Sequence, residues 1–403
     1  MTSTLLPTVD PLLSWREEFP ILARTTYLVS NSLGAMPRAA ERQLAAYADQ
    51  WATRGVRAWA DGWWAMPLTV GDAVAPLIGA HAGEVAMIPT VSAGHASVVT
   101  ALPYDDGRDT IVMTALDFPS VRYTVEALAA RLGARVVVVP SEDGLTIDAH
   151  ALHAAIDERT RLVAVSHVLF KSAYVLDAAA LVQHAHAQGA LVALDAYHAV
   201  GVLPVDVHAL GVDFYLGGVL KWLCGGPGGS FLYVSPAVRD RHLPAVTGWQ
   251  AHRTPFAFAE QMEPASGLWR WLGGTPTVPA LFAAIEGPRL LAEAGVRAIR
   301  AKSERQTAAL IAAAESRGWT VNAPREAARR GGTVAIDVPH AYEVAQALLA
   351  RDILVDFRDG VGIRVAPHFY TRDDEIEQCV AAIDEILATG AWTPWAGRRG
   401  VVT

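Results

Sequence analysis

The sequence predicts an α/β protein built on a mainly parallel β-sheet, followed by a smaller α+β lobe. From residue 85 onward, short apolar runs rich in β-branched residues alternate with longer stretches whose apolar residues recur every three to four positions. This alternation is typical of βα units wound on a parallel sheet. After residue 288 the pattern changes to one long Ala-rich stretch and a few short strand-like runs, which indicates a separate lobe. A chain of 403 residues has room for both lobes.

The large lobe is expected to contain a sheet of about seven strands. Six apolar runs are predicted as strands, at residues 85–89, 111–115, 135–140, 162–166, 190–195 and 212–216. Three stretches between them are predicted as helices, at 121–132, 147–156 and 178–188. A seventh run, 230–234, follows the glycine-rich segment 225–229 instead of a helix, so we expect it to join the sheet antiparallel.

The small lobe is predicted from a different order of elements. These are a helix over 289–316, a strand at 333–338, a helix from Tyr342, strands at 353–356 and 362–365, and a last helix at 374–387. We therefore predict three parts in the chain: an N-terminal segment, 1–45, that packs on the small lobe or on a partner, a large cofactor-binding domain, 46–288, and a small domain, 289–403.

Composition narrows the class of protein. The net charge is −8 and no basic run occurs, which argues against nucleic-acid binding. The longest uncharged stretch, 85–104, contains prolines, a glycine and a histidine, so no membrane helix is expected. Residues 1–11 lack the positively charged start that is typical of a secretory signal. The two cysteines show neither the spacing of metal ligands nor a CxxC redox motif. A cytoplasmic enzyme for small molecules is expected, and an apolar fraction of 52% favours a subunit interface.

Asp195 and Lys221 are the first candidates for chemistry. Asp195 ends an apolar strand, and Lys221 follows another apolar run before a glycine-rich turn. Taken alone, the two are compatible with a buried ion pair or with solvated charges at strand ends. Pyridoxal 5′-phosphate (PLP), however, requires a lysine for its aldehyde and a carboxylate for its pyridine nitrogen. His198 shares the turn with Asp195 and either braces that carboxylate, faces the ring or serves only the structure.

Other residues complete this hypothesis. Val91 and Ser92 begin a predicted helix after a strand, where backbone N–H groups bind a phosphate, although Ser and Thr cap many helices. Phe118 follows a strand and either stacks on a planar ring or packs in the core. Arg364 either clamps a carboxylate or lies on the surface. No metal motif is present, and segment 225–229 is not a dinucleotide fingerprint because it leads into a strand.

Motifs along most of the chain resemble those of PLP-dependent enzymes of fold type I, in the class V aminotransferase branch, and among these the kynureninases. The motifs lie at 31–34, 117–120, 165–168, 195–198, 211–214, 221–228, 248–249, 274–276, 330–332, 356–358 and 363–364. The resemblance implies that Lys221 is the Schiff-base lysine, that Asp195 pairs with the pyridinium, and that His198 supports it.

The same resemblance implies further site residues and a homodimer. Phe118 would stack on PLP, and Val91 and Ser92 would hold its phosphate. Trp249 and Thr275 match residues that reach the cofactor phosphate from the neighbouring subunit, which implies shared active sites. Arg364 matches the clamp for the substrate's α-carboxylate, and Asn31 is expected beside the substrate.

Four positions differ from the kynureninase pattern, all on the side of the substrate. Leu220 stands where kynureninases carry Tyr, Val121 where they carry Asp, Gly273 where they carry Asn, and Lys171 where they carry Arg. The loss of a phenol, a carboxylate and an amide predicts a different pocket for the substrate's side chain.

The leading functional prediction is a kynureninase-like lyase or hydrolase that acts on an amino acid through an external aldimine and cleaves it on the β-carbon side. A class V aminotransferase is the alternative, because it starts from the same imine. A cysteine desulfurase or C–S lyase is less favoured, because neither Cys224 nor Cys379 falls on a suitable loop of the second lobe. A catalytically silent protein that keeps the fold is the last alternative, and the presence of Lys221 and Asp195 argues against it.

Overall fold

The computed structural model describes residues 10–398 and residue 400. Within these residues a seven-stranded sheet forms the large lobe, with the strand order β2, β8, β7, β6, β5, β3, β4. The strands are β2 (Val85–Ile88), β3 (Thr110–Thr114), β4 (Arg135–Val139), β5 (Thr160–Ser166), β6 (Leu191–Asp195), β7 (Phe214–Gly218) and β8 (Ser230–Val234). Strands β3 to β7 pair in parallel, and β8 runs antiparallel to both of its neighbours. The predicted mainly parallel sheet and its one antiparallel strand are confirmed.

Both faces of this sheet are buried, which explains why its strands read as continuous apolar runs. Alternate residues of β6 show the two faces: Val192 and Leu194 join one apolar cluster, and Ala193 joins another on the opposite side. Helices cover each face, with α3 and α4 packed together on the Ala193 side. Each strand therefore packs through both of its sets of alternate side chains.

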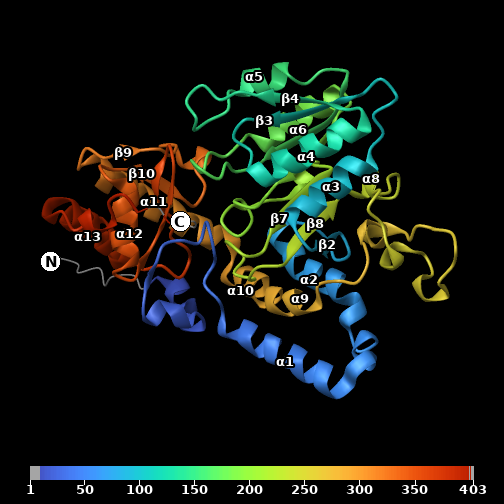
Figure 1. Cartoon of the computed structure of the whole chain (residues 1–403), viewed down its shortest axis with the longest axis horizontal. Coiled ribbons are helices and arrows are strands. Elements are labelled where there is room, and N and C mark those ends of the chain that lie inside the picture. Colours follow the sequence, from blue (N-terminus) through green and yellow to red (C-terminus); the bar gives the residue numbers. More distant parts are fainter. Residues whose placement is uncertain (1–9, 399, 401–403) are drawn as a thin grey trace, which may run out of the picture.

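The three helices predicted in the large lobe correspond to α4, α5 and α6, and the lobe contains further helices that were not predicted. They are α1 (Arg38–Arg54), α2 (Met66–Val74), α3 (Val91–Ala101), α4 (Pro119–Leu132), α5 (Ala149–Ala154), α6 (Ala178–Ala187), α7 (Val207–Leu210), α8 (Pro236–Arg239), α9 (Val278–Ala284) and α10 (Glu286–Ala294). Helix α1 runs along the outside of the molecule toward α2, and the segment between α8 and α9 projects from the large lobe on the side away from the small lobe (Figure 1). Short 3-10 helices link these elements.

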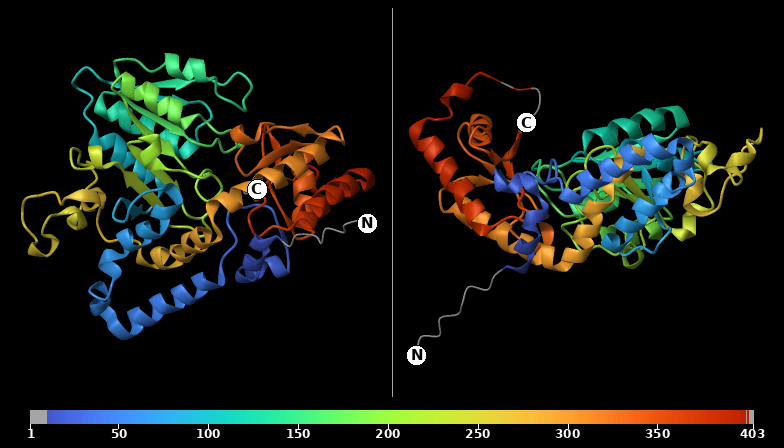
Figure 2. Two further views of the ribbon diagram at one scale, coloured as in Figure 1. Left: turned by 180° about the vertical axis from the view of Figure 1, so that it is seen from behind. Right: turned by 90° about the horizontal axis from the view of Figure 1, so that it is seen from below.

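The small lobe contains a four-stranded antiparallel sheet within the described residues, in the order β12, β13, β10, β9. Its strands are β9 (Thr320–Val321), β10 (Val334–Asp337), β12 (Asp356–Arg358) and β13 (Gly362–Val365). Its helices are α11 (Val296–Glu315), α12 (Ala341–Leu349) and α13 (Asp373–Thr389). Helices α10 and α11 carry the chain from the large lobe into the small one (Figures 1 and 2).

Two predictions for the small lobe were wrong in detail. The helix predicted over 289–316 is broken at Gly295, whose φ of +84° ends α10 before α11 begins. The strand predicted at 353–356 is two strands, β11 (Ile353–Leu354) and β12, because β11 pairs in parallel with β1 (Thr26–Tyr27) and β12 pairs with β13. A sequence pattern does not reveal which partner each half of an apolar run finds.

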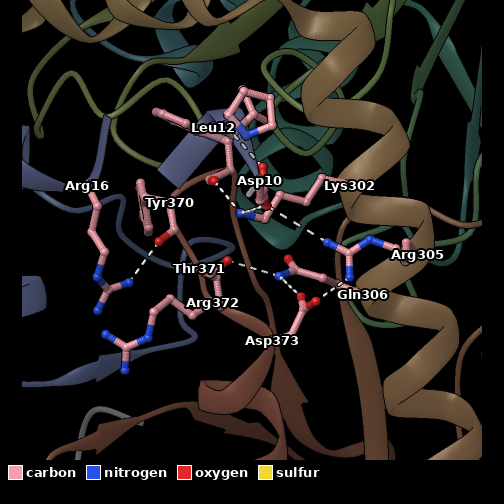
Figure 3. A network of polar contacts seen from close by, with 12 residues as sticks. Asp10, Leu12, Arg16, Lys302, Arg305, Gln306, Tyr370, Thr371, Arg372 and Asp373 are labelled. Atoms are coloured by element: carbon pink, nitrogen blue, oxygen red, sulfur yellow. Dashed lines mark hydrogen bonds and ion pairs between the residues drawn. The ribbon is translucent and has the colours of Figure 1, made fainter. Parts of the chain in front are cut away.

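The N-terminal segment lies against the small lobe. Arg16 forms an ion pair with Glu375 of α13, with 2.6 Å between Nη2 and Oε1, and Asp10 pairs with Lys302 of α11 at 2.7 Å. The surrounding network of side chains is drawn in Figure 3. The predicted boundary at residue 45 falls inside α1, and the division into three domains stays a prediction.

Part of the predicted absence of a secretory signal concerns residues 1–9, which lie outside the described residues. Among the helices that the structure describes, none is long and apolar enough to cross a membrane.

Candidate active site

A cavity of about 400 Å³ lies at the carboxyl ends of the parallel strands, where open α/β sheets bind their ligands. Each neighbouring strand ends in a residue or turn that lines it: Pro89 follows β2, Phe118 follows β3, and Ser166 ends β5. The lining also includes the predicted residues Val91, Ser92, Asp195, His198 and Lys221. The structure thus brings together predicted site residues that are up to 130 positions apart in the chain, counting from Val91 to Lys221.

Lys221 follows β7 after a two-residue turn, and its ammonium points into the cavity. Its Nζ lies 2.8 Å from Nε2 of His198 and 4.5 Å from the centre of the Tyr197 ring. Burial, followed by the charge of Arg364, lowers the pKa of Lys221 to about 7. Burial and then the charge of Lys221 hold the pKa of His198 well below its usual value. A large fraction of Lys221 is therefore a neutral, nucleophilic amine at neutral pH.

A glycine of β7 places Tyr197 beside this lysine. A Cβ on Gly218 would lie 2.0 Å from Cζ of Tyr197, so only a glycine leaves room for the ring. The Tyr197 backbone N–H also donates to Oδ1 of Asp195 at 2.8 Å. Sequence reasoning missed Tyr197, although its place between Asp195 and His198 in one turn was a signal.

His95 is a second residue that sequence reasoning missed. It lies one helical turn after Val91 on α3, is fully buried, and its Nε2 is 3.9 Å from Oδ2 of Asp195. Neither ring nitrogen has a hydrogen-bond partner among the described residues. Oδ2 of Asp195 therefore faces a buried polar ring. In this buried region, a carboxylate oxygen without a partner raises the free energy of the folded state.

The N-terminus of α3 opens onto the cavity. Thr90 caps this helix, because its Oγ1 accepts a hydrogen bond from the N–H of Ala93 at 3.1 Å. Val91 and Ser92 form the first helical positions and line the cavity beside Ser230 of β8. The helix dipole, its unpaired N–H groups and two hydroxyls form a site suited to a phosphate.

Phe118 is held over the cavity by its neighbour Asp117. The buried carboxylate of Asp117 accepts hydrogen bonds from the N–H of Thr114 at 2.7 Å and from the N–H of Ser166 at 2.6 Å. These bonds join the ends of β3 and β5. The Phe118 ring is 42% exposed, and its centre lies 5.7 Å from Nζ of Lys221. An aromatic ring left this accessible is available to stack on a planar ligand.

Arg364 lies at the edge of the site and not among the residues that line the cavity. Its Nε and Nη2 bind the buried carboxylate of Asp356 at 2.8 and 2.5 Å, and its Nη1 donates to the carbonyl of Phe170 at 2.5 Å. Phe170 itself lines the cavity. Asn31 is fully buried nearby in the chain segment next to Ser32, and neither atom of its amide has a partner among the described residues. Such an amide has both a donor and an acceptor free for a ligand.

Trp249 and Thr275 do not reach the Lys221 cavity of their own chain. Thr275 lines a separate cavity of about 360 Å³, together with Gly273. Trp249 packs against Trp64, with ring centres 4.8 Å apart, and against Phe258 at 6.0 Å. Since the prediction assigns both residues to the neighbouring subunit, it is not tested by a single chain.

The positions that differ from the kynureninase pattern separate into two groups. Val121 and Leu220 line the Lys221 cavity and make its wall apolar. Lys171 instead donates to the carbonyl of Asp359 at 3.4 Å, and Gly273 lies at the second cavity. The expected difference in the pocket is therefore located at Val121 and Leu220 within one chain.

Pyridoxal 5′-phosphate fits the residues that are present. The site contains a buried amine with a pKa near 7, a carboxylate with one free oxygen, an accessible aromatic ring and a helix N-terminus, all around one cavity. These are the groups that bind, respectively, an aldehyde, a pyridine nitrogen, a planar ring and a phosphate. Fold and site together define a PLP-dependent enzyme of fold type I.

Comparisons with known proteins agree with this class. Residues 54–373 match the model of the aminotransferase class-V family, and the chain belongs to that family. It is 34% identical to a kynureninase of Burkholderia pseudomallei over 98% of this chain and 97% of that protein. Among solved structures, it is similar to a cysteine desulfurase of Thermococcus onnurineus, with 21% identity, a TM-score of 0.82, and coverage of 93% of this chain and 98% of that one. It is also similar to a C-DES variant with glycine covalently linked to its PLP cofactor, with 23% identity, a TM-score of 0.82, and coverage of 91% and 98%.

The structural likeness to a cysteine desulfurase extends to the fold and not to a reactive thiol. Cys224 and Cys379 are both buried and unpaired, and burial raises the pKa of each thiol to about 12. A thiol with such a pKa is almost fully protonated at neutral pH and is a poor nucleophile.

Proposed function

We propose that this protein is a PLP-dependent lyase of the kynureninase type, which cleaves an amino acid on the side of its β-carbon. The observation that carries the proposal is the buried Lys221 amine, 2.8 Å from His198 at the carboxyl ends of the strands. The 34% identity to kynureninases over nearly the whole chain supports the choice of reaction within the family.

We assign the cofactor to residues of this cavity. Lys221 would bind the aldehyde, Asp195 would hold the proton on the pyridine nitrogen, Phe118 would cover the ring, and Val91 and Ser92 would hold the phosphate. When bound, PLP supplies an aldehyde that condenses with amines and a ring that accepts electrons from the substrate's Cα. The residues of the chain hold this group in place and exclude water from it.

Lys221 is also the proposed base for the Cα proton. A pKa near 7 lets its Nζ accept a proton and return it within the same pH range. His198 keeps a neutral imidazole against Nζ because burial and the lysine charge lower its pKa. The imidazole therefore orients the amine without competing for the positive charge.

The substrate is proposed to lie between the cavity and the small lobe. Arg364 would bind its α-carboxylate and Asn31 would contact it, while Val121 and Leu220 would line the space for its side chain. Because Asp356 already occupies two nitrogens of Arg364, the guanidinium is oriented in advance of binding.

A homodimer with shared sites is part of the proposal. Its support is the loop between α8 and α9, which projects from the large lobe (Figure 1) and exposes large apolar side chains. Val246, Phe256 and Phe258 are 64%, 61% and 74% exposed. Such a patch favours contact with another chain, and Trp249 lies inside it. A cytoplasmic location also stays a proposal, based on the unpaired thiols of Cys224 and Cys379.

A class V aminotransferase is the second candidate. The observation in its favour is the apolar wall of Val121 and Leu220, which offers no polar group to a leaving group on the β-carbon side. Transfer of an amino group requires only that Lys221 move a proton between the substrate's Cα and the cofactor.

The test is product analysis with purified protein, PLP and L-kynurenine, followed by other amino acids with and without a keto acid. We expect one of these amino acids to be cleaved on the β-carbon side without any acceptor, and no product to form in Lys221→Ala. Anthranilate and alanine would identify that substrate as kynurenine. Turnover that requires a keto acid would replace the lyase with an aminotransferase. A protein that binds PLP without turning over any amino acid would contradict both candidates.

A further inference from the structure

Three side chains with metal-binding atoms meet at the end of the sheet opposite to the Lys221 cavity. His81 and Glu84 lie just before β2, whose other end leads to the cavity, and His208 lies on α7. One ligand atom from each of the three lies within 4.8 Å of the others. Both histidines are exposed to solvent, so an ion has access to the cluster.

The chain holds this cluster in shape without a ligand. The N–H of His81 donates to Oε2 of Glu84 at 2.9 Å, and the N–H of Glu84 donates back to the carbonyl of His81 at 3.1 Å. On the other side, Asp206 accepts hydrogen bonds from the N–H groups of His208 and Ala209 at 3.0 and 2.9 Å. Both backbones that carry the ligands are therefore fixed by local hydrogen bonds, which lowers the entropic cost of binding.

Contacts between the side chains also point toward a common centre. Nε2 of His208 lies 2.8 Å from Oε2 of Glu84, and the rings of His81 and His208 are 4.7 Å apart. The Tyr233 ring packs edge-on against His208, with ring centres 6.0 Å apart. Glu84 is only 7% exposed, so its carboxylate is largely removed from water, where an ionised oxygen gains most from a cationic partner.

We propose that His81, Glu84 and His208 bind a divalent transition-metal ion of the zinc class. Two imidazoles and one carboxylate suit zinc and its neighbours, whereas magnesium and calcium prefer oxygen ligands. The ion replaces the hydrogen bond between His208 and Glu84. An imidazole that binds the ion through Nε2 carries its hydrogen on Nδ1.

The proposed site links two segments that are far apart in the sequence. Glu84 and His208 are separated by 124 positions, so the sequence contains no compact metal motif and predicts no metal site. A bound ion would join the start of β2 to α7 and leave a coordination position for water. Because the Lys221 cavity lies at the other end of the strands, the ion is a separate ligand from the cofactor.

The test is zinc binding by the untagged holoenzyme after dialysis against a chelator, measured by elemental analysis and by competition with a chromogenic chelator. We expect one zinc per chain. Loss of one of three ligands, in His81→Gln or His208→Gln, is expected to raise the dissociation constant by at least about tenfold. The matched control is His153→Gln, which removes one ring of another pair of neighbouring histidines, His153 and His184, stacked with ring centres 4.5 Å apart.

The outcome separates this site from other zinc-binding groups. The proposal is supported if His153→Gln still binds zinc tightly while His81→Gln and His208→Gln no longer do. Absence of stoichiometric zinc in the unmodified protein overturns it, as does equal binding by all three variants, which would place the ion at the cofactor phosphate or elsewhere. Cobalt binding, read from visible absorption bands, provides a second measurement, and circular dichroism checks that each variant is folded.

Discussion

His95 lies behind Asp195, with Nε2 of the imidazole 3.9 Å from Oδ2 of the carboxylate and both groups almost fully buried. This separation exceeds a hydrogen bond, so the contact is electrostatic in the structure as it stands. It places a polar ring behind the carboxylate that the proposed cofactor requires.

We expect His95→Leu to weaken PLP binding, because an apolar side chain would leave Oδ2 of Asp195 without its polar neighbour. The cost of about 1 kcal/mol corresponds to roughly a fivefold higher dissociation constant. His95→Asn retains a polar group at the same helix position and is expected to recover part of the affinity. Equilibrium dialysis of PLP measures both, and an unchanged constant in His95→Leu would show that the ring is only a core residue.

The pKa of Lys221 predicts how PLP is taken up by cofactor-free protein. Only the neutral amine attacks an aldehyde, and burial lowers the pKa of Lys221 to about 7. The rate should therefore increase as the pH rises through about 7 and then level off, whereas an exposed lysine would continue to gain up to a pKa of about 10.4. Stopped-flow absorbance of the bound cofactor measures the profile. Lys221→Ala should show no such phase, and a midpoint above pH 9 would disprove the assignment.

The Asp356–Arg364 pair predicts a large effect on stability. Removal of one partner from a buried pair costs about 3–5 kcal/mol, because the other charge is left buried. Arg364→Met should lower the free energy of unfolding by up to that amount, with part of the cost offset by Arg358, whose Nη2 lies 3.3 Å from Oδ2 of Asp356. Replacement of both, in Arg364→Met with Asp356→Leu, should restore much of it. Urea denaturation followed by circular dichroism measures the difference. A single variant as stable as the double one would mean that Arg358, which already forms an ion pair with Asp356, is a sufficient partner for the carboxylate.

The same pair has a predicted pH dependence. Burial opposes ionisation of Asp356, but the hydrogen bonds and the charge of Arg364 outweigh it and lower the pKa of the carboxyl. Because the folded pKa is below the unfolded value of about 3.9, this stabilisation is fully present above that value. It is lost as the pH falls through the folded pKa. Unfolding free energies measured between pH 3 and pH 6, roughly the range that brackets the unfolded value, should show a smaller pH dependence in the double variant than in the unmodified protein.

Gly34 connects the N-terminal segment to the lysine. Its N–H donates to the carbonyl of Leu220 at 2.8 Å, and an added Cβ would lie 2.1 Å from the carbonyl oxygen of Lys221. Gly34→Ala should therefore destabilise the protein and displace Lys221, with an effect of about 1–3 kcal/mol from overpacking. Gly273→Ala is the control for stability, because an added Cβ there meets nothing within 4 Å. Equal melting temperatures of the two variants would contradict the close approach.

The two cysteines provide a test against desulfurase chemistry. Since both thiols are buried and their pKa values are raised to about 12, neither should serve as a nucleophile. Replacement of both by Ala should leave turnover of the identified substrate within about twofold of the unmodified rate, as for changes away from the reacting groups. Loss of turnover in a folded double variant would return a cysteine to the mechanism.

Much of the secondary structure of the large lobe could be predicted from the sequence, because strands that are buried on both faces appear as continuous apolar runs. Apolar runs such as 190–195 are needed wherever a parallel strand is covered by helices on each side. The antiparallel direction of β8 also followed, since the glycine-rich turn before it is too short for a crossover helix. The small lobe was less predictable: Gly295 breaks a helix that its apolar periodicity continues, and the run at 353–356 is divided between two sheets.

The sequence by itself determined the chemistry that is available in this protein: a lysine, a carboxylate and a helix N-terminus, each placed at the end of a recognisable strand. Strand ends gather at one edge of a parallel sheet, so local pattern was enough to bring Lys221 and Asp195 to one cavity. Only the tertiary structure decided how these groups are tuned. The position of His95 behind Asp195, the anchoring of Arg364 by Asp356 and the meeting of His81 with His208 depend on packing between distant segments. Spacing along a chain does not encode such contacts, because side-chain distances across elements are set by how the elements pack.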